Sequence, residues 1–300
     1  MEIDYRKVMG VEKLAEEAHG GLGVSIAILD SGDPKPLCLP SCQVFLDRDK
    51  RQPDEFGHAT AIASILFGGN GIIGVCEGAR PSYVKVLDDE GRGSIKSVVD
   101  GIYWALDNDI DLINMSLGFM RTEKCPKSLE KACDRARKAG KAVFCAAGND
   151  GGPVNWPAAL KSTICVGSIA ENGLKSSFSS VGEVDFVAPG QNLRVLNTNG
   201  NMISASGTSF STALVTGVAA LIVARMKAQN PKSVSFESIR WSLRRMSSDI
   251  DAPGWDKMTG YGLISGKKRD PTVCLGIEQG FFGRIIAMIK SLLGIKTRSD

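Results

Sequence analysis

The sequence predicts an α/β fold, a doubly wound, mostly parallel sheet of about seven strands with helices on both faces. Short apolar runs rich in β-formers alternate with helical patterns along the chain. These runs are apolar at consecutive positions, which is typical of strands buried on both faces. A chain of 300 residues with 43% hydrophobic and 23% charged residues is long and apolar enough for one large domain of this class.

Each expected element has its own pattern. Five of the six strand-like runs end at Gly, Asn or Asp, and the helical runs place apolar residues three and four positions apart. Ser94 is the expected cap of one helix, and Gly140 ends another. The expected strands are VSIAILD (24–30), SYVKVLD (82–88), DLINMSLG (111–118), AVFCAAGN (142–149), TICVGSI (163–169) and VDFVAPG (184–190). The expected helices cover residues 58–68, 94–109, 128–140, 208–226 and 235–246.

Charge and composition argue against several function classes. The net charge is +3, and the main body has no basic stripe, so we expect no nucleic-acid partner. The first 25 residues contain no apolar segment typical of a secretory signal, and we see no apolar run that would span a bilayer. None of the eight cysteines forms a CxxC pair. We therefore expect free thiols and a cytoplasmic location.

Four polar clusters lie at the ends of predicted strands or at the start of a predicted helix, where a ligand is expected to bind. In a doubly wound sheet, ligands bind beyond the carboxyl ends of the strands. The clusters are Asp30-Ser31-Gly32, Ser116-Leu117-Gly118, Gly148-Asn149-Asp150 and Gly207-Thr208-Ser209.

Each candidate residue also has a structural interpretation. Asp30 and Asn149 suit turns, His58 suits a helix start, and Ser209 suits a helix cap. In the functional interpretation, Asp30 is a buried acid that orients His58, and His58 is a base. Ser209 is then a nucleophile at a helix N-terminus, and Asn149 donates its amide to an oxyanion.

Taken together, these segments resemble the subtilisin-like serine proteases, or subtilases, of an intracellular type. The resemblance covers about residues 8 to 266 and lies in AILDSG, GHATAIASI, AAGN, SASGTSFSTALVTGVAALI and GYGLI, in that order. It implies a subtilisin-like fold and a serine endopeptidase that processes a precursor site-selectively. It also implies a catalytic set of Asp30, His58 and Ser209, with Asn149 in the oxyanion hole.

The same resemblance implies how a peptide substrate binds. An extended peptide would pair with two flanking strands by β-augmentation. These strands contain Gly91, Arg92 and Gly93 on one side, and Ser116, Leu117 and Gly118 on the other. The pocket for the side chain before the scissile bond would be lined by Ala146, Ala147, Gly148 and Asn155. Asp150 at its rim would favour a basic side chain.

Three positions depart from the family pattern. Ala59 and Ala61 replace a usual Gly and a common His, and Ala213 replaces a usual Pro four residues after the nucleophile. Alanine lacks the proline ring and would leave more room beside Ser209. That room would favour acyl transfer to an amine, so a peptide ligase or macrocyclase is an alternative function. A non-catalytic peptide-binding scaffold is another. The segment at 68–79 occupies the place of a family calcium loop, but Glu77 is its only acid, so we expect no metal or other cofactor.

The C-terminal part does not resemble the family. We expect a catalytic domain at 1–266, a linker at 267–279 and an amphipathic helix at 280–300. Its apolar face consists of Phe281, Phe282, Ile285, Ile286, Ile289, Leu292 and Leu293. Two uses of residues 280–296 stay open: peripheral contact with the inner membrane surface, or packing on the domain or a partner.

Overall fold

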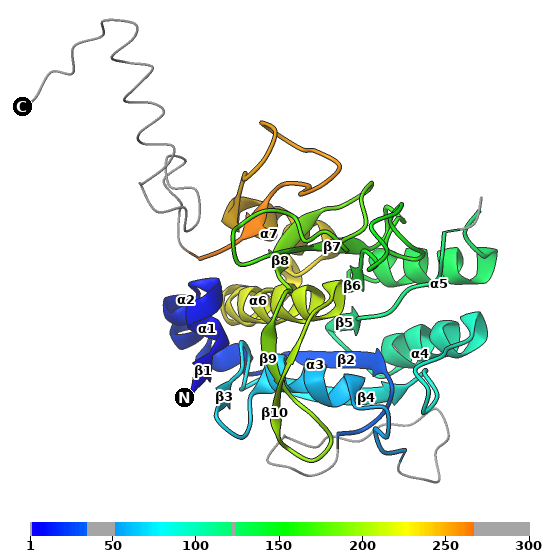
Figure 1. The fold of residues 1–300 in the computed structure, drawn as a ribbon, viewed down its shortest axis with the longest axis horizontal. Coiled ribbons are helices and arrows are strands. Elements are labelled where there is room, and N and C mark those ends of the chain that lie inside the picture. Colours follow the sequence, from blue (N-terminus) through cyan, green and yellow to red (C-terminus); the bar gives the residue numbers. More distant parts are fainter. Residues whose placement is uncertain (1, 35–51, 122–123, 267–300) are drawn as a thin grey trace, which may run out of the picture.

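A sheet of eight strands forms the centre of the protein, with the strand order β11-β12-β8-β7-β6-β5-β2-β4 (Figure 1). The computed structural model describes residues 2–34, 52–121 and 124–266. All neighbouring strands are parallel except β11, which pairs antiparallel with β12. The strands are β2 (Ser25–Asp30), β4 (Arg80–Lys85), β5 (Leu112–Met115), β6 (Ala142–Ala146), β7 (Ile164–Ile169), β8 (Phe186–Pro189), β11 (Ser247–Ser248) and β12 (Leu263–Ile264).

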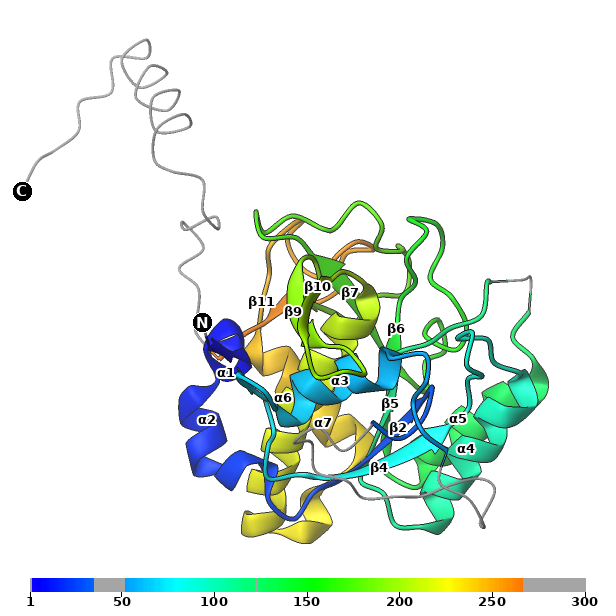
Figure 2. The ribbon, with the colours of Figure 1, turned by 60° about the horizontal axis from the view of Figure 1, so that its bottom comes forward.

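Helices cover both faces of this sheet (Figures 1 and 2). On one face lie α3 (His58–Phe67), α6 (Thr208–Gln229) and α7 (Phe236–Met246), and on the other lie α4 (Ile95–Asp107) and α5 (Lys127–Lys138). Residues of β2 alternate between the two cores: Ile26 and Ile28 face the first layer, and Ala27 and Leu29 the second. This explains why the strand is apolar at consecutive positions.

The predicted fold class is confirmed, and so are the six predicted strands and five predicted helices. Several strands end earlier than expected; for example, β5 ends at Met115 and β6 at Ala146. Ser116 and Asn149, which follow these two strands, bond to the first residues of α6 instead. Ser94 caps α4 as expected, with a capping box to Ser97.

Several small elements were not predicted. They are α1 (Tyr5–Met9), α2 (Glu12–Glu17), the 3₁₀ turns η1 (His19–Gly21) and η2 (Pro231–Ser233), the parallel pair β1 (Ile3–Asp4) and β3 (Ile72–Ile73), and the hairpin β9 (Leu193–Leu196) and β10 (Met202–Ala205). The strands among them have two to four residues, too few to show a period in the sequence. The predicted linker at 267–279 and helix at 280–300 lie outside the described residues.

The long helix α6 runs through the centre of the molecule (Figure 2). Among the described residues it is the one helix long and apolar enough to cross a membrane, yet 89% of its most apolar window is buried inside the protein. Its composition therefore reflects a core position.

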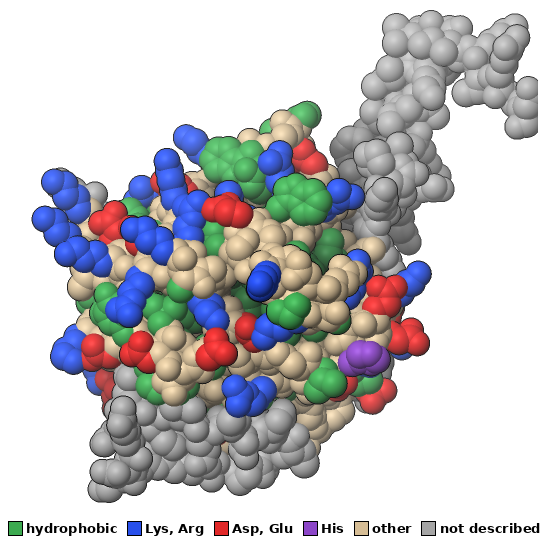
Figure 3. All heavy atoms as spheres, turned by 180° about the vertical axis from the view of Figure 1, so that it is seen from behind, with side chains coloured by type: hydrophobic (Ala, Val, Ile, Leu, Met, Phe, Trp, Pro, Cys, Tyr) green, Lys and Arg blue, Asp and Glu red, His purple; other side chains and the backbone are tan. Residues whose placement is uncertain are grey.

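The face shown in Figure 3 carries Lys and Arg side chains mixed with Asp and Glu. Several arginines rest on aromatic rings or pair with acids. Arg137 stacks on Phe236 and pairs with Glu237, and Arg245 stacks on Trp241. These two arginines are thus engaged by neighbouring side chains.

The sheet also fixes where a site can form. β2 lies between β4 and β5, although the chain visits β4 before β5. The strand order therefore reverses at β2, and the carboxyl ends of β2 and β5 border the switch point. Asp30 ends the first of these strands, and Ser116 follows the second.

Candidate active site

An acid and a base meet at the end of β2. Asp30 is the last residue of that strand and is fully buried, and His58 is the first residue of α3. The His58 Nδ1 atom lies 2.8 Å and 2.9 Å from the two carboxylate oxygens of Asp30. The Nδ1 proton is therefore donated to Asp30, which leaves Nε2 unprotonated on the far side of the ring.

The environment of His58 shifts the pKa of its ring. Burial by itself lowers this pKa, but the charge and hydrogen bond of Asp30, together with the charge of Asp54, outweigh burial and raise it above the ordinary value. The raised pKa means that the neutral ring is a stronger base. The same carboxylates stabilise the imidazolium that forms when the ring takes a proton.

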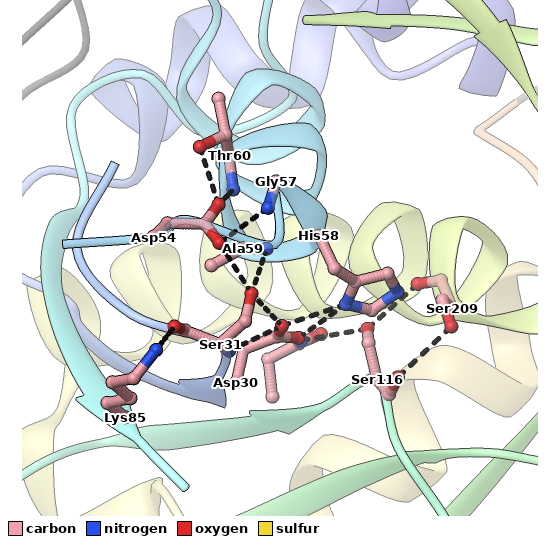
Figure 4. A network of polar contacts seen from close by, with 11 residues as sticks. Asp30, Ser31, Asp54, Gly57, His58, Ala59, Thr60, Lys85, Ser116 and Ser209 are labelled. Atoms are coloured by element: carbon pink, nitrogen blue, oxygen red, sulfur yellow. Dashed lines mark hydrogen bonds and ion pairs between the residues drawn. The ribbon is translucent and has the colours of Figure 1, made fainter. Parts of the chain in front are cut away.

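A second buried carboxylate, Asp54, holds the helix that carries His58. Its oxygens accept hydrogen bonds from the Ser31 hydroxyl (2.8 Å), from Gly57 N (2.7 Å) and from both N and Oγ1 of Thr60 (2.7 and 2.6 Å) (Figure 4). The N-cap of α3 is Gly57, which has φ +90° and no side chain to cap the helix. Asp54 and Ser31 therefore satisfy the free N–H groups in its place.

The sequence analysis did not single out Asp54 or assign a role to Ser31. Asp54 stands in the stretch PDEFG, which is ordinary turn chemistry, and its contacts arise only in the fold. The one available signal was its position four residues before His58, just ahead of a helix start.

The candidate nucleophile, Ser209, is the second residue of α6. Figure 4 shows the ring of His58 lying between Asp30 and Ser209. The Ser209 hydroxyl donates to the carbonyl of Ser116 at 3.0 Å, and the Ser116 hydroxyl donates to the carbonyl of Ser209 at 2.9 Å. Gly207 is the N-cap of α6, with no side-chain cap bond, so the interpretation of Ser209 as a cap is wrong.

The side chain of Asn149 is fixed by the neighbouring Thr208. Its Oδ1 accepts from both the N and the Oγ1 of Thr208, each at 2.9 Å. Because the oxygen is engaged there, the Nδ2 group points elsewhere and can donate to a negatively charged oxygen beside Ser209. The oxyanion role of Asn149 stays a prediction.

A groove of about 360 Å³ leads away from His58. It brings together the predicted substrate-flanking residues, which are Gly91, Arg92 and Gly93 from one segment and Ser116, Leu117 and Gly118 from another. Phe56, Leu87 and Phe119 complete its lining. Gly91 has a φ of +76°, and a Cβ atom on it would lie 2.5 Å from the ring of Phe56. The close approach of Phe56 therefore requires a glycine at this position.

The residues predicted for the specificity pocket do not line this groove, but several of them lie close to one another. Asn155 approaches both Gly118 and Gly148, and Ala146 ends β6 beside them. Asp150 is exposed, and its Oδ1 accepts hydrogen bonds from the Ser180 hydroxyl at 2.8 Å and from Gly152 N at 3.0 Å. Two hydrogen bonds lower the pKa of the Asp150 carboxyl: the larger effect comes from the Ser180 hydroxyl and the smaller from the N–H of Gly152.

Across residues 2–34, 52–121 and 124–266, no group of three or more His, Cys, Asp and Glu side chains is placed to hold a metal ion. Five cysteines in these ranges have free thiols: Cys76, Cys125, Cys133, Cys145 and Cys165. Cys38, Cys42 and Cys274 lie outside them. The absence of a cofactor stays a prediction.

Comparisons with known proteins agree with this geometry. Residues 21–262 match the model of the Subtilase family. The chain is 35% identical over 260 residues to the thermostable alkaline protease of Halalkalibacterium halodurans, an alignment that covers 83% of this chain and 69% of that protein. It is 34% identical over 255 residues to the minor extracellular protease Epr of Bacillus subtilis, covering 82% of this chain and 38% of that protein.

Two solved structures are also similar. The prenylagaramide maturation protease PagA has a TM-score of 0.75 at 27% identity, and the match covers 85% of this chain and 95% of that one. A lanthipeptide protease has a TM-score of 0.77 at 23% identity, with coverage of 87% and 90%, and shows the same fold.

Proposed function

The chain belongs to the subtilase family of serine endopeptidases, and on this premise we propose that it processes a protein or peptide precursor at selected sites through an Asp30–His58–Ser209 triad. The observation that carries the proposal is the position of His58. Its ring is bound to buried Asp30 through Nδ1 and faces Ser209 on the other side.

The proposed reaction follows from these positions. The Ser209 oxygen bonds to the substrate carbonyl carbon while its proton passes to Nε2 of His58, and Asp30 stabilises the imidazolium. The negative oxygen of the tetrahedral intermediate accepts from Nδ2 of Asn149. The carbon–nitrogen bond then breaks, and the amine leaves with the proton from His58. Water, deprotonated by His58, cleaves the acyl-enzyme to a carboxylic acid and frees Ser209.

The groove supports an extended peptide as the substrate. Its two sides are backbone segments around Gly91 and Ser116, which can pair with a third strand placed between them. Selective processing is supported by the likeness to PagA, a prenylagaramide maturation protease.

The test is covalent labelling of the folded protein. We expect a small fluorophosphonate to label the wild-type chain and mass spectrometry of its peptides to locate the adduct on Ser209. Ser209→Ala removes the label. Ser211→Ala is a matched control, because Ser211 lies on the same helix and donates to the carbonyl of Ala188 at 3.0 Å. A wild-type protein that stays unlabelled would favour the non-catalytic scaffold.

A further inference from the structure

A groove of about 410 Å³ lies on the surface between α6, α7 and α2. Two helical stripes form its sides: positions 222, 225, 226 and 229 of α6, and positions 241, 242, 245 and 246 of α7. Leu14 of α2 completes the apolar lining. Residues three and four positions apart lie on one face of a helix, so the groove runs between two helices, a shape that can receive a third helix.

The apolar lining of this groove is continuous with the protein core. Ile222 is buried, and Leu14, Met226 and Met246 are half-buried side chains that pack against the core. Trp241 is 58% exposed, although it is a large apolar side chain. An exposed tryptophan beside half-buried apolar side chains is typical of a surface that binds an apolar partner.

The two arginines at the rim are engaged by their neighbours. Arg225 pairs with Glu17 at 3.2 Å, and the guanidinium of Arg245 lies 4.8 Å from the ring centre of Trp241. Ion pairing with these arginines is therefore not what would attract an occupant. We expect an occupant that presents an apolar face instead.

The described part of the chain ends beside the same groove. Ser265 N donates to the carbonyl of Met246, a lining residue, at 3.1 Å. Gly266 N donates to the carbonyl of Met9 at 3.0 Å, just before the turn that leads into α2. Residues 267–300 therefore continue from a point next to the groove.

The sequence that continues from this point contains a matching apolar face. The expected helix places its apolar residues from Phe281 to Leu293 on one side. Residues 267–280 can span up to about 46 Å when extended, so the segment can reach the whole groove. A tethered segment is also present at a high effective concentration, which favours it over a separate partner.

We propose that residues 281–293, the apolar part of the expected C-terminal helix, dock in this groove of the same chain and cover Trp241. This inference goes beyond the proposed function and does not depend on it. It selects packing on the domain among the uses that the sequence left open. The groove lies along the C-terminal half of α6, and Ser209 is the second residue of that helix. Docking should therefore stabilise the domain without covering the candidate active site.

The first experiment is a double-mutant cycle on the full chain, measured by thermal denaturation. Ile289→Asp places a charge at the centre of the expected apolar face, and Trp241→Ala removes the exposed wall of the groove. We expect each variant to lower the Tm by at least about 4 °C. The double variant should fall little further, because both changes break the same contact.

Two matched controls accompany this cycle. Ser291→Asp adds the same charge to the opposite side of the expected helix and should leave the Tm unchanged. Trp255→Ala removes another exposed tryptophan, which does not line the groove, and its effect should add fully to that of Ile289→Asp. Additive losses for Trp241→Ala and Ile289→Asp would overturn the proposal.

A photo-crosslink tests the position of the segment directly. With Phe282→p-benzoylphenylalanine in the full chain, we expect adducts within one chain on peptides that contain Met226 or Met246. Adducts elsewhere in the domain would overturn the proposal. Adducts only between chains would also overturn it and would indicate a second copy as the occupant.

Vesicles of phosphatidylglycerol and phosphatidylcholine test the membrane alternative. Co-sedimentation of the wild-type chain that Ile289→Asp abolishes, with the Tm of that variant unchanged, would overturn docking and favour the membrane. Fluorophosphonate labelling of Ser209 should persist in all these variants, because the groove is remote from it. Failure of the wild-type chain to label would count against the proposed function alone.

Discussion

Ser209 and Ser116 are joined by two reciprocal hydrogen bonds, each from the hydroxyl of one residue to the carbonyl of the other. Asn114 extends this pair, because its Nδ2 donates to Ser116 Oγ at 3.0 Å and its Oδ1 accepts from Thr216 at 3.0 Å. A chain of buried polar groups thus fixes the end of β5 against the first turns of α6. Ser209, the proposed nucleophile, and the segment at Ser116 proposed to pair with the substrate are therefore held together as one unit.

Ser116→Ala tests this unit. The variant loses the hydroxyl that donates to the carbonyl of Ser209 and accepts from Nδ2 of buried Asn114, but it keeps the carbonyl that accepts from the Ser209 hydroxyl. Since one net hydrogen bond is worth about 1 kcal/mol, we expect the loss of these two bonds to lower the free energy of unfolding by about 2 kcal/mol and kcat by several-fold. Thermal denaturation and steady-state kinetics measure the two effects. Unchanged kcat would show that the tie does not position Ser209.

Asp54→Asn tests the electrostatics around His58. Burial lowers the pKa of His58, while the charges of Asp30 and Asp54 raise it. Removing the Asp54 charge therefore lowers that pKa, and the neutral base persists to lower pH. We expect the acid limb of the kcat/KM profile to move to lower pH, with the plateau above it largely kept.

Asp100→Asn is the control for this shift, because Asp100 pairs with Lys96 at the surface of α4 and does not contact the site. A purely structural role of Asp54 would lower the melting temperature of Asp54→Asn without moving the acid limb. That combination would contradict the electrostatic role of Asp54.

Asn149→Ala removes the expected oxyanion donor. Loss of one such donor in subtilisin costs about 10²–10³ in kcat, and we take that figure over for Asn149. The KM should change much less, because the donor bonds to charge that develops only in the transition state.

Thr208→Val is the graded comparison for Asn149. It removes one of the two hydrogen bonds to Asn149 Oδ1 and leaves the bond from the Thr208 backbone. A much smaller fall in kcat is expected. Equal losses in the two variants would mean that Asn149 acts by holding the turn and not by donating to the substrate.

The acyl-transfer alternative depends on Ala213. This side chain is fully buried in the core beside α3 and does not line the groove. We therefore expect hydrolysis to dominate when a cleavable peptide is incubated with an added amine peptide and the products are weighed by mass spectrometry. A substantial amine adduct that disappears in Ala213→Pro would instead support the ligase.

The sheet could be predicted from the sequence because it leaves local signals. β2 is apolar at consecutive positions because both of its faces are buried. Asp30, Asn149 and Ser209 were marked as candidates because they stand near the ends of predicted strands or helices, and His58 because the chain has only two histidines. The roles of these four residues stay predictions.

The supporting residues could not be predicted in the same way. Asp54 accepts from Thr60 and Ser31, partners that the sequence does not mark as bonded to it. Asn155 was assigned to a pocket only by resemblance, and it lies close to two glycines, Gly118 and Gly148, that follow different strands. Such effects arise from packing between elements and have no period or motif of their own.

The bonds between Ser116 and Ser209 join positions 93 residues apart in the chain. Contacts of that sequence separation form late in folding, since a long loop must close first. A chain that has been synthesised only as far as residue 207 lacks α6 and therefore lacks Ser209, the proposed nucleophile. The proposed triad can therefore assemble only after most of the described fold has been synthesised.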